Sequence, residues 1–133
     1  MMGLHSGATM ERQALIVRES GNALFGNAMN YPLFDVPDTW GNPDLGNSYR
    51  SVIRSDHKTL FVSGTLDPGA LPDQAEEIRQ GFSRSAHCIV QYADHRDIIA
   101  HSKVQRVILD FLVDKQVQDR HIPVNKPQFL PIP

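Results

Sequence analysis

Two apolar runs with a helical pattern between them dominate the second half of the sequence. Leu60–Val62 form the first run and Cys88–Tyr92 lie in the second. Neither run alternates strictly with polar residues, which is typical of strands buried on both faces of a parallel sheet. Between them, Pro68-Gly69 indicates a turn, and the pattern over residues 72–82 predicts a helix with Pro72 at its first position and a buried stripe of Ala75, Ile78 and Phe82. We therefore predict a parallel strand–helix–strand unit.

A second amphipathic helix is predicted after this unit. Apolar residues recur at helical spacing after Ser102, which is a suitable N-cap: Val104, Val107, Ile108, Phe111 and Leu112. The tail QVQDRHIPVNKPQFLPIP carries four prolines, and we expect it to form an extended strap.

The first half of the chain has weaker patterns. Residues 10–29 predict two short helices, separated at Ser20-Gly21-Asn22, with the second carrying Leu24, Phe25 and Ala28. Residues 30–57 are rich in Pro, Gly, Asn and Asp. Four aromatic residues in this stretch either form a small satellite cluster on the domain or line a pocket under a lid: Tyr31, Phe34, Trp40 and Tyr49.

The composition favours an ordinary globular protein and argues against a nucleic-acid-binding or membrane-spanning one. The 133 residues carry a net charge of −2 and are 41% hydrophobic, as in an ordinary globular protein. No basic patch is interleaved with aromatic residues, so we expect no nucleic-acid partner. No apolar run approaches the length of a membrane span, and MMGLHSGATMERQ lacks the order of a signal peptide; the compartment stays open.

Asp67 and His95 follow the two predicted strands, 28 residues apart. Because the carboxyl ends of neighbouring parallel strands converge in one crevice, we expect these two side chains to meet there. An Asp that holds a His is the acid–base half of a Ser-His-Asp relay. Taken singly, Asp67 is equally typical of a turn or cap and His95 of a surface position.

The segments around these two residues resemble the carboxyl-terminal part of α/β-hydrolases. GTLDPGALPDQAEEIRQGF and HCIVQYADHRDII carry the likeness, and the subgroup is that of tripeptidyl-aminopeptidases and proline iminopeptidases. AMNYP, PDLGNSYRSVIRSD and DFLVDKQVQDRHIPVNKPQFLP are also similar to their counterparts, so the resemblance covers nearly the whole chain.

This resemblance implies an α/β fold: residues 1–56 would be a remnant of the lid and its connection, and residues 57–133 the carboxyl-terminal βαβα segment of the core, with an extended tail. Asp67 would be the acid and His95 the base, in an exopeptidase for small or proline-containing amino termini.

Two features depart from the family. Asp94 stands where a glycine usually precedes the His, and its carboxylate could compete with Asp67 for the His95 proton. Pro68-Gly69 also replaces a longer polar turn.

The nucleophile is missing. These hydrolases carry it in a G-x-S-x-G elbow, in the chain order Ser, acid, His, and that motif does not occur in the sequence. Ser6 has no strand before it, and Ser63 lies inside the first predicted strand, so neither is a credible nucleophile. The central strands of the sheet are not encoded either, so we expect the first strand to present an unpaired apolar edge.

Other chemistries fit less well. Gly64 and Gly69 have the spacing of a phosphate-binding loop, but no Lys-Ser/Thr pair follows them. The six histidines lack metal-ligand spacing, so we expect no metal site and no cofactor. Cys88, the only cysteine, cannot form an intramolecular disulfide, and its position within a strand predicts a buried core residue.

Three hypotheses remain open at this stage. The chain is the carboxyl-terminal part of a serine hydrolase that binds a peptide or ester only when an upstream segment completes it. Alternatively, it is a non-catalytic module that binds a partner or self-associates through the open strand edge. The third hypothesis is a self-sufficient hydrolase with another nucleophile.

Overall fold

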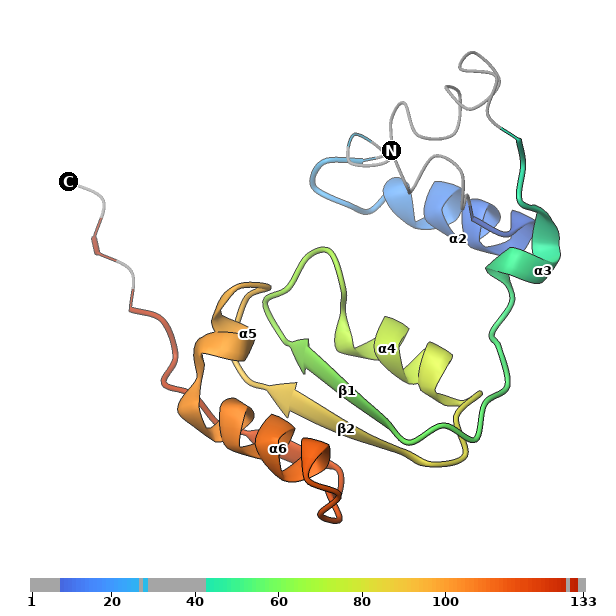
Figure 1. Cartoon of the computed structure of the whole chain (residues 1–133). Coiled ribbons are helices and arrows are strands. Elements are labelled where there is room, and N and C mark those ends of the chain that lie inside the picture. The colour runs from blue at the N-terminus through green and yellow to red at the C-terminus, as the bar shows by residue number, and fades with distance from the viewer. Residues whose placement is uncertain (1–7, 27, 29–42, 129, 132–133) are drawn as a thin grey trace. The chain divides into compact units, whose positions relative to one another are not determined.

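The computed structural model describes residues 8–26, 28, 43–128 and 130–131 and divides the chain into two compact units, residues 1–51 and 52–133 (Figure 1). The sequence predicted a boundary after residue 56. Tyr31, Phe34 and Trp40, three of the aromatic residues of the proposed satellite cluster, lie outside the described residues.

The first unit contains two described helices. Helix α2 spans Met10–Ser20, and its first turn is capped by Thr9, whose Oγ1 accepts a hydrogen bond from the amide of Arg12 at 3.3 Å. The predicted second helix is wrong, since residues 21–26 form turns instead. Gly26 adopts a left-handed φ of 54°, and Leu24 and Phe25 are exposed, so a helix there would have no core to pack against. Helix α3 spans Gly46–Arg50, where Tyr49 is exposed.

A three-stranded parallel sheet forms the second unit. Strand β1 (Thr59–Gly64) pairs with β2 (Ser85–Val90), which pairs with β3 (Arg120–Ile122), and the order β1-β2-β3 follows the sequence. The predicted parallel strand–helix–strand unit is therefore confirmed. The tail was predicted to form an extended strap; within it, β3 joins the sheet by pairing Arg120–Ile122 with Cys88–Val90. These strands and helices agree with the α/β fold class predicted from the sequence.

Helices cover both faces of this sheet (Figure 1). Helix α4 (Pro72–Arg79) connects β1 to β2, and the short α5 (Asp97–Ala100) leads into α6 (Ser102–Leu112). The sequence placed the N-cap of α6 at Ser102, but His101 fills that position. Its Nδ1 accepts a hydrogen bond from the Lys103 amide at 3.3 Å, which frees Ser102 to be the first helical residue.

The core lies between α6 and the sheet. Its buried residues come from β2, the following loop, α5, α6 and β3: Cys88, Val90, Ala93, Ile98, Val104, Val107 and Ile122. Cys88 is fully buried, as predicted. On the α4 side the predicted buried stripe is only partly correct, because Ile78 is exposed while Ala75 and Phe82 are half-buried.

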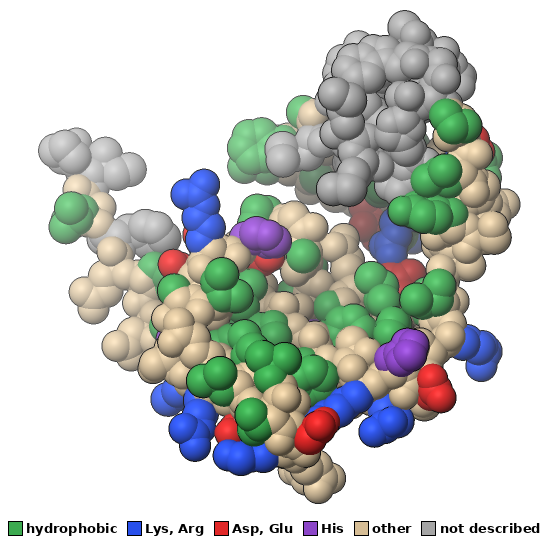
Figure 2. All heavy atoms as spheres, viewed as in Figure 1, with side chains coloured by type: hydrophobic (Ala, Val, Ile, Leu, Met, Phe, Trp, Pro, Cys, Tyr) green, Lys and Arg blue, Asp and Glu red, His purple; other side chains and the backbone are tan. Residues whose placement is uncertain are grey.

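Strand β1 is an outer strand of the described sheet, and its residues Leu60, Phe61 and Val62 are only half-buried. Figure 2 shows hydrophobic side chains gathered on the face of this unit where β1 lies in Figure 1. Exposed large side chains of the unit include Leu66, Ile78, Leu109 and Leu112. In the described part of the chain, no helix is both long and apolar enough to cross a membrane.

Candidate active site

The two strand ends that carry Asp67 and His95 are joined by backbone hydrogen bonds. The amide of Thr65 donates to the carbonyl of Val90 at 3.1 Å, and that of Leu66 donates to Ala93 at 3.0 Å. In return, the Tyr92 amide donates to the Thr65 hydroxyl at 2.8 Å. These bonds hold the segment after β1 beside the segment after β2. They therefore bring Asp67 and His95, which lie on these two segments, close to each other.

Two unusual backbone positions make this close approach possible. A Cβ on Gly64 would lie 2.3 Å from the carbonyl oxygen of Ala93, so only glycine fits at the end of β1. Tyr92, two residues after the end of β2, adopts a left-handed φ of 58°, which is uncommon for a residue with a side chain. Strain of this kind costs about 1–3 kcal/mol and persists where the surrounding structure enforces it.

Asp67 and His95 are in contact, as their positions at the strand ends predicted. His95 Nδ1 lies 2.7 Å from Asp67 Oδ2, a charge-assisted distance. The other oxygen, Asp67 Oδ1, accepts hydrogen bonds from the amides of Gly69 at 2.9 Å and Ala70 at 3.1 Å. The Asp67 side chain is 2% exposed and that of His95 is 77% exposed. The carboxylate is thus enclosed while the imidazole is open to a further group.

The electrostatics favour an ionised Asp67. The hydrogen bond from His95 lowers the pKa of the Asp67 carboxyl, and the bonds from the Gly69 and Ala70 amides add to this, against burial, which raises it. An ionised carboxylate can only accept, so Nδ1 of His95 carries the proton of this bond. In the neutral ring the lone pair is therefore on Nε2, the nitrogen that a general base uses.

Asp94 does not compete with Asp67 in this structure. Its Oδ1 accepts hydrogen bonds from the amides of Arg96 at 2.8 Å and Asp97 at 2.9 Å, at the start of α5. These two bonds lower the pKa of Asp94. The residue that departs from the family pattern thus organises the turn after His95, and the His95 Nδ1 bond goes to Asp67.

Comparison with known families agrees with this geometry. The family model described as TAP-like protein matches residues 22–123, which is most of the chain. The chain belongs to the TAP-like family of α/β-hydrolases. The resemblance recognised in the sequence is therefore confirmed. No curated protein and no solved structure matches the chain.

Of the serines considered as a nucleophile for this TAP-like chain, Ser63 is buried in β1 and Ser6 lies outside the described residues. Ser63 Oγ is 3.0 Å from His87 Nε2, a contact that sequence reasoning missed. The sequence did contain one indication of this contact: His87 lies within an apolar strand, where a buried polar side chain needs a hydrogen-bond partner. Cys88 is a poor alternative nucleophile, because burial raises the pKa of its thiol.

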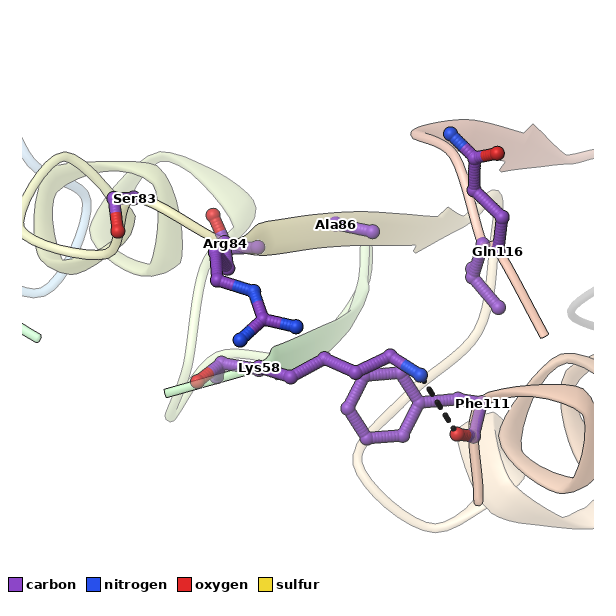
Figure 3. Close-up of a pocket in the computed structure, with 9 residues that line it drawn as sticks. Lys58, Ser83, Arg84, Ala86, Phe111 and Gln116 are labelled. Atoms are coloured by element: carbon purple, nitrogen blue, oxygen red, sulfur yellow. Dashed lines mark hydrogen bonds between the residues drawn. The ribbon is translucent and has the colours of Figure 1, made fainter. Parts of the chain in front are cut away.

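Two cavities of the second unit lie at opposite ends of the paired strands β1 and β2. One of about 380 Å³ opens at the amino ends of β1 and β2, lined by Lys58, Arg84, Phe111 and Gln116 among others (Figure 3). There Lys58 Nζ donates to the carbonyl oxygen of Phe111 at 3.3 Å and to Asp114 at 2.9 Å. Another, of about 460 Å³, adjoins the carboxyl ends and is lined by Thr65, Leu71, Pro72, Asp73, Ile89, Gln91 and His121. No group of three metal-ligating side chains occurs among the described residues.

Proposed function

We propose that this chain is the carboxyl-terminal part of a serine hydrolase, in which Asp67 is the acid and His95 the base of a Ser-His-Asp triad. The observation that carries the proposal is the 2.7 Å contact between Asp67 Oδ2 and His95 Nδ1. Membership of the TAP-like family supports it. An enclosed carboxylate behind an open imidazole is the arrangement that a triad requires.

In the proposed mechanism, His95 moves protons and Asp67 holds it. A serine oxygen attacks the carbonyl carbon of a peptide or ester while His95 Nε2 takes the hydroxyl proton. The same nitrogen then gives that proton to the leaving amine or alcohol. Water attacks the acyl-enzyme in a second round of the same transfers. Asp67 stays ionised throughout and stabilises the imidazolium.

The serine comes from outside these 133 residues, since the sequence contains no G-x-S-x-G and Ser63 is bonded to His87 within the sheet. A parallel strand added to the outer edge of β1 would bring its own carboxyl end beside Asp67 and His95. We therefore propose that a segment with the nucleophile pairs there, and that the chain alone does not hydrolyse peptides. The resemblance to tripeptidyl-aminopeptidases and proline iminopeptidases extends the proposal to removal of residues from small or proline-containing amino termini.

An assay with two substrate types tests both parts of the proposal. The 133-residue chain is incubated with p-nitrophenyl acetate, which an imidazole can cleave by itself, and with alanyl and prolyl coumarin amides, which need the whole triad. We compare wild type, His95→Ala and a control, His121→Ala, which removes another exposed histidine. In the ester reaction, Nε2 attacks the acetyl carbon, p-nitrophenolate leaves, and water converts the acyl-imidazole to acetate.

We expect slow release of p-nitrophenolate that His95→Ala reduces and His121→Ala does not, with no cleavage of the amides. Equal ester rates in wild type and His95→Ala would refute a base role for His95. Amide cleavage by the wild type that His95→Ala abolishes would show a nucleophile within the chain, and the requirement for a second segment would be wrong.

The second candidate is a non-catalytic module that self-associates through β1. It is favoured by the composition of that strand, since Thr59–Gly64 contains no charged residue to discourage edge pairing. Sedimentation over a range of concentrations tests it, with Leu66→Lys as the variant, because Leu66 is exposed two residues after the end of the strand. Concentration-dependent association that the lysine weakens supports this candidate, and a monomer at every concentration contradicts it.

A further inference from the structure

A second histidine–carboxylate cluster lies beneath α4, separate from the Asp67–His95 pair. His87 stands on β2 with a side chain that is only 2% exposed. Its Nε2 lies 3.0 Å from the hydroxyl of Ser63 on β1, and its Nδ1 lies 3.3 Å from Oε1 of Glu76 on α4. Its backbone amide donates to Oδ1 of Asp119, before β3, at 2.9 Å. From β2, His87 thus contacts β1, α4 and the segment that leads into β3.

Arg79 closes these contacts into a ring. Its Nη1 donates to both oxygens of Glu76, at 2.5 and 3.1 Å, and its Nη2 donates to both oxygens of Asp119, at 2.9 and 2.8 Å. The bond from Arg79 lowers the pKa of Glu76, and the bond from the His87 amide lowers the pKa of Asp119. We call Ser63, Glu76, Arg79, His87 and Asp119 the α4 network. Its carboxylates are ionised and each has a cationic partner.

The direction of the bonds within the α4 network follows from the donors available. A carboxylate can only accept, so His87 Nδ1 carries a hydrogen toward Glu76, and in the neutral ring Nε2 accepts from the Ser63 hydroxyl. The order serine, histidine, carboxylate is that of a catalytic relay. Ser63, however, is 3% exposed and lies within β1, so a substrate has no access to it. The hydrogen bonds from Ser63 to His87 to Glu76 therefore have a structural role: they join β1, β2 and α4.

The elements that the α4 network joins are those at both ends of the Asp67 loop. Ser63 lies on β1 just before the loop, and Glu76 lies on the helix that begins just after it, at Pro72. The loop between them supplies the Gly69 and Ala70 amides that hold Asp67 Oδ1. His87 connects the two sides across the sheet. Helix α4 itself has no fully buried residue, so its polar contacts are a large part of what holds it in place.

We propose that His87 and Glu76 are positioning residues for Asp67: by fixing α4 to the sheet, they keep the loop amides on the carboxylate that orients His95. This inference deepens the proposed function, because positioning serves catalysis only if Asp67 is the triad acid. The structural part of it, from His87 through α4 to Asp67, can be measured on the chain without any activity.

Two substitutions of His87 separate its two side-chain bonds. His87→Asn keeps a polar atom near the position of Nδ1, toward Glu76, and loses the one toward Ser63. His87→Gln keeps a polar atom near Nε2, toward Ser63, and loses the one toward Glu76. In the proposal, the bond from His87 to Glu76 holds α4, and α4 holds the Asp67 loop. Only the substitution that removes this bond should therefore loosen the loop.

The measured quantity is the pKa of Asp67, from the pH dependence of its side-chain carboxyl ¹³C signal in the full chain, together with the urea midpoint of unfolding. We expect His87→Asn to leave this pKa low and His87→Gln to raise it by about half a pH unit or more, as hydrogen bonds to the charged form are lost. Val107→Ala is the control. It lowers the urea midpoint through the core on the other face, and should leave the Asp67 pKa unchanged.

A wild-type Asp67 pKa in His87→Gln would overturn the proposal, and so would an equal rise in Val107→Ala, since that effect would be general destabilisation. If the His87 variants do not fold, Glu76→Ala decides by the same measurement, because it removes the acceptor of the His87 Nδ1 bond on a half-buried residue: a raised Asp67 pKa supports the proposal and a wild-type value overturns it. The p-nitrophenyl acetate assay of His95→Ala separately tests the proposed function. The two measurements can therefore fail independently.

Discussion

Replacement of Gly64 by alanine tests whether the closeness of the two strand ends holds the acid–base pair together. The added Cβ would lie 2.3 Å from the Ala93 carbonyl oxygen and 2.9 Å from its carbon. Backbone atoms this close must separate, by roughly 1 Å to reach an ordinary contact. That movement breaks the 3.0 Å bond from the Leu66 amide to Ala93 and shifts His95, which follows on the same segment.

The expected cost follows from these contacts. Overpacking at a well-packed site costs about 1–3 kcal/mol, and a lost backbone hydrogen bond adds about 1 kcal/mol. We therefore expect Gly64→Ala to lower the free energy of unfolding by about 2–4 kcal/mol. The Asp67 pKa should also rise, because the His95 bond that lowers it is lengthened.

Gly69→Ala is the matched control within the same site. A Cβ there meets Asp67 Oδ1 at 3.5 Å, an ordinary contact, and the amide that donates to Asp67 is retained. Such a substitution stabilises by about 0.4–1 kcal/mol through the unfolded state, so the two variants should differ in sign. Urea unfolding followed by circular dichroism measures both. A Gly64→Ala variant as stable as wild type, with an unchanged Asp67 pKa, would refute the reasoning.

Two further predictions concern ionisation. The folded protein has lowered pKa values for Asp67, Glu76 and Asp119. Their ionised forms therefore stabilise the fold at any pH above the pKa values of the unfolded chain, which are about 4. This stabilisation is lost as the pH falls through the lower pKa values of the folded protein. Urea midpoints should therefore decline below about pH 4.5, and a midpoint that is constant down to pH 3 would contradict this. Cys88 is fully buried and its thiol pKa is raised, so Ellman's reagent should react with the native chain on the order of a hundredfold more slowly than in urea; equal rates would place Cys88 at the surface.

Much of the second unit could be predicted from hydrophobic periodicity. The two apolar runs gave β1 and β2, and the apolar residues spaced along 104–112 gave α6, because each pattern matches the period of its element. The Asp67–His95 contact could also be predicted, since it depends only on where two parallel strands end. These features share one property: they follow from local pattern and a simple rule of topology.

The features that were missed depend on tertiary contacts. Strand β3 has only three residues and lies in a proline-rich tail, so its pairing with Cys88–Val90 has no sequence signal of its own. Likewise, His87 gave no reason to expect bonds to Ser63 and Glu76, because α4 must be in place before these groups meet. The left-handed conformation of Tyr92 also has no sequence signal, and its amide bonds to Thr65, a residue 27 positions away.

The bonds that hold Asp67 and His95 indicate how a complete triad would form. The hydrogen bonds to the Asp67 carboxylate come from Gly69, Ala70 and His95, and none of these three comes from the outer edge of β1. Exposed apolar side chains near that strand include Leu66, two residues after its end, and Ile78 on α4, the helix that follows it. Under the proposed function, a segment with the serine would therefore bury apolar surface at the edge and meet an acid–base pair that is already assembled. Completing the triad would then require docking of the new strand but no rearrangement of Asp67 or His95.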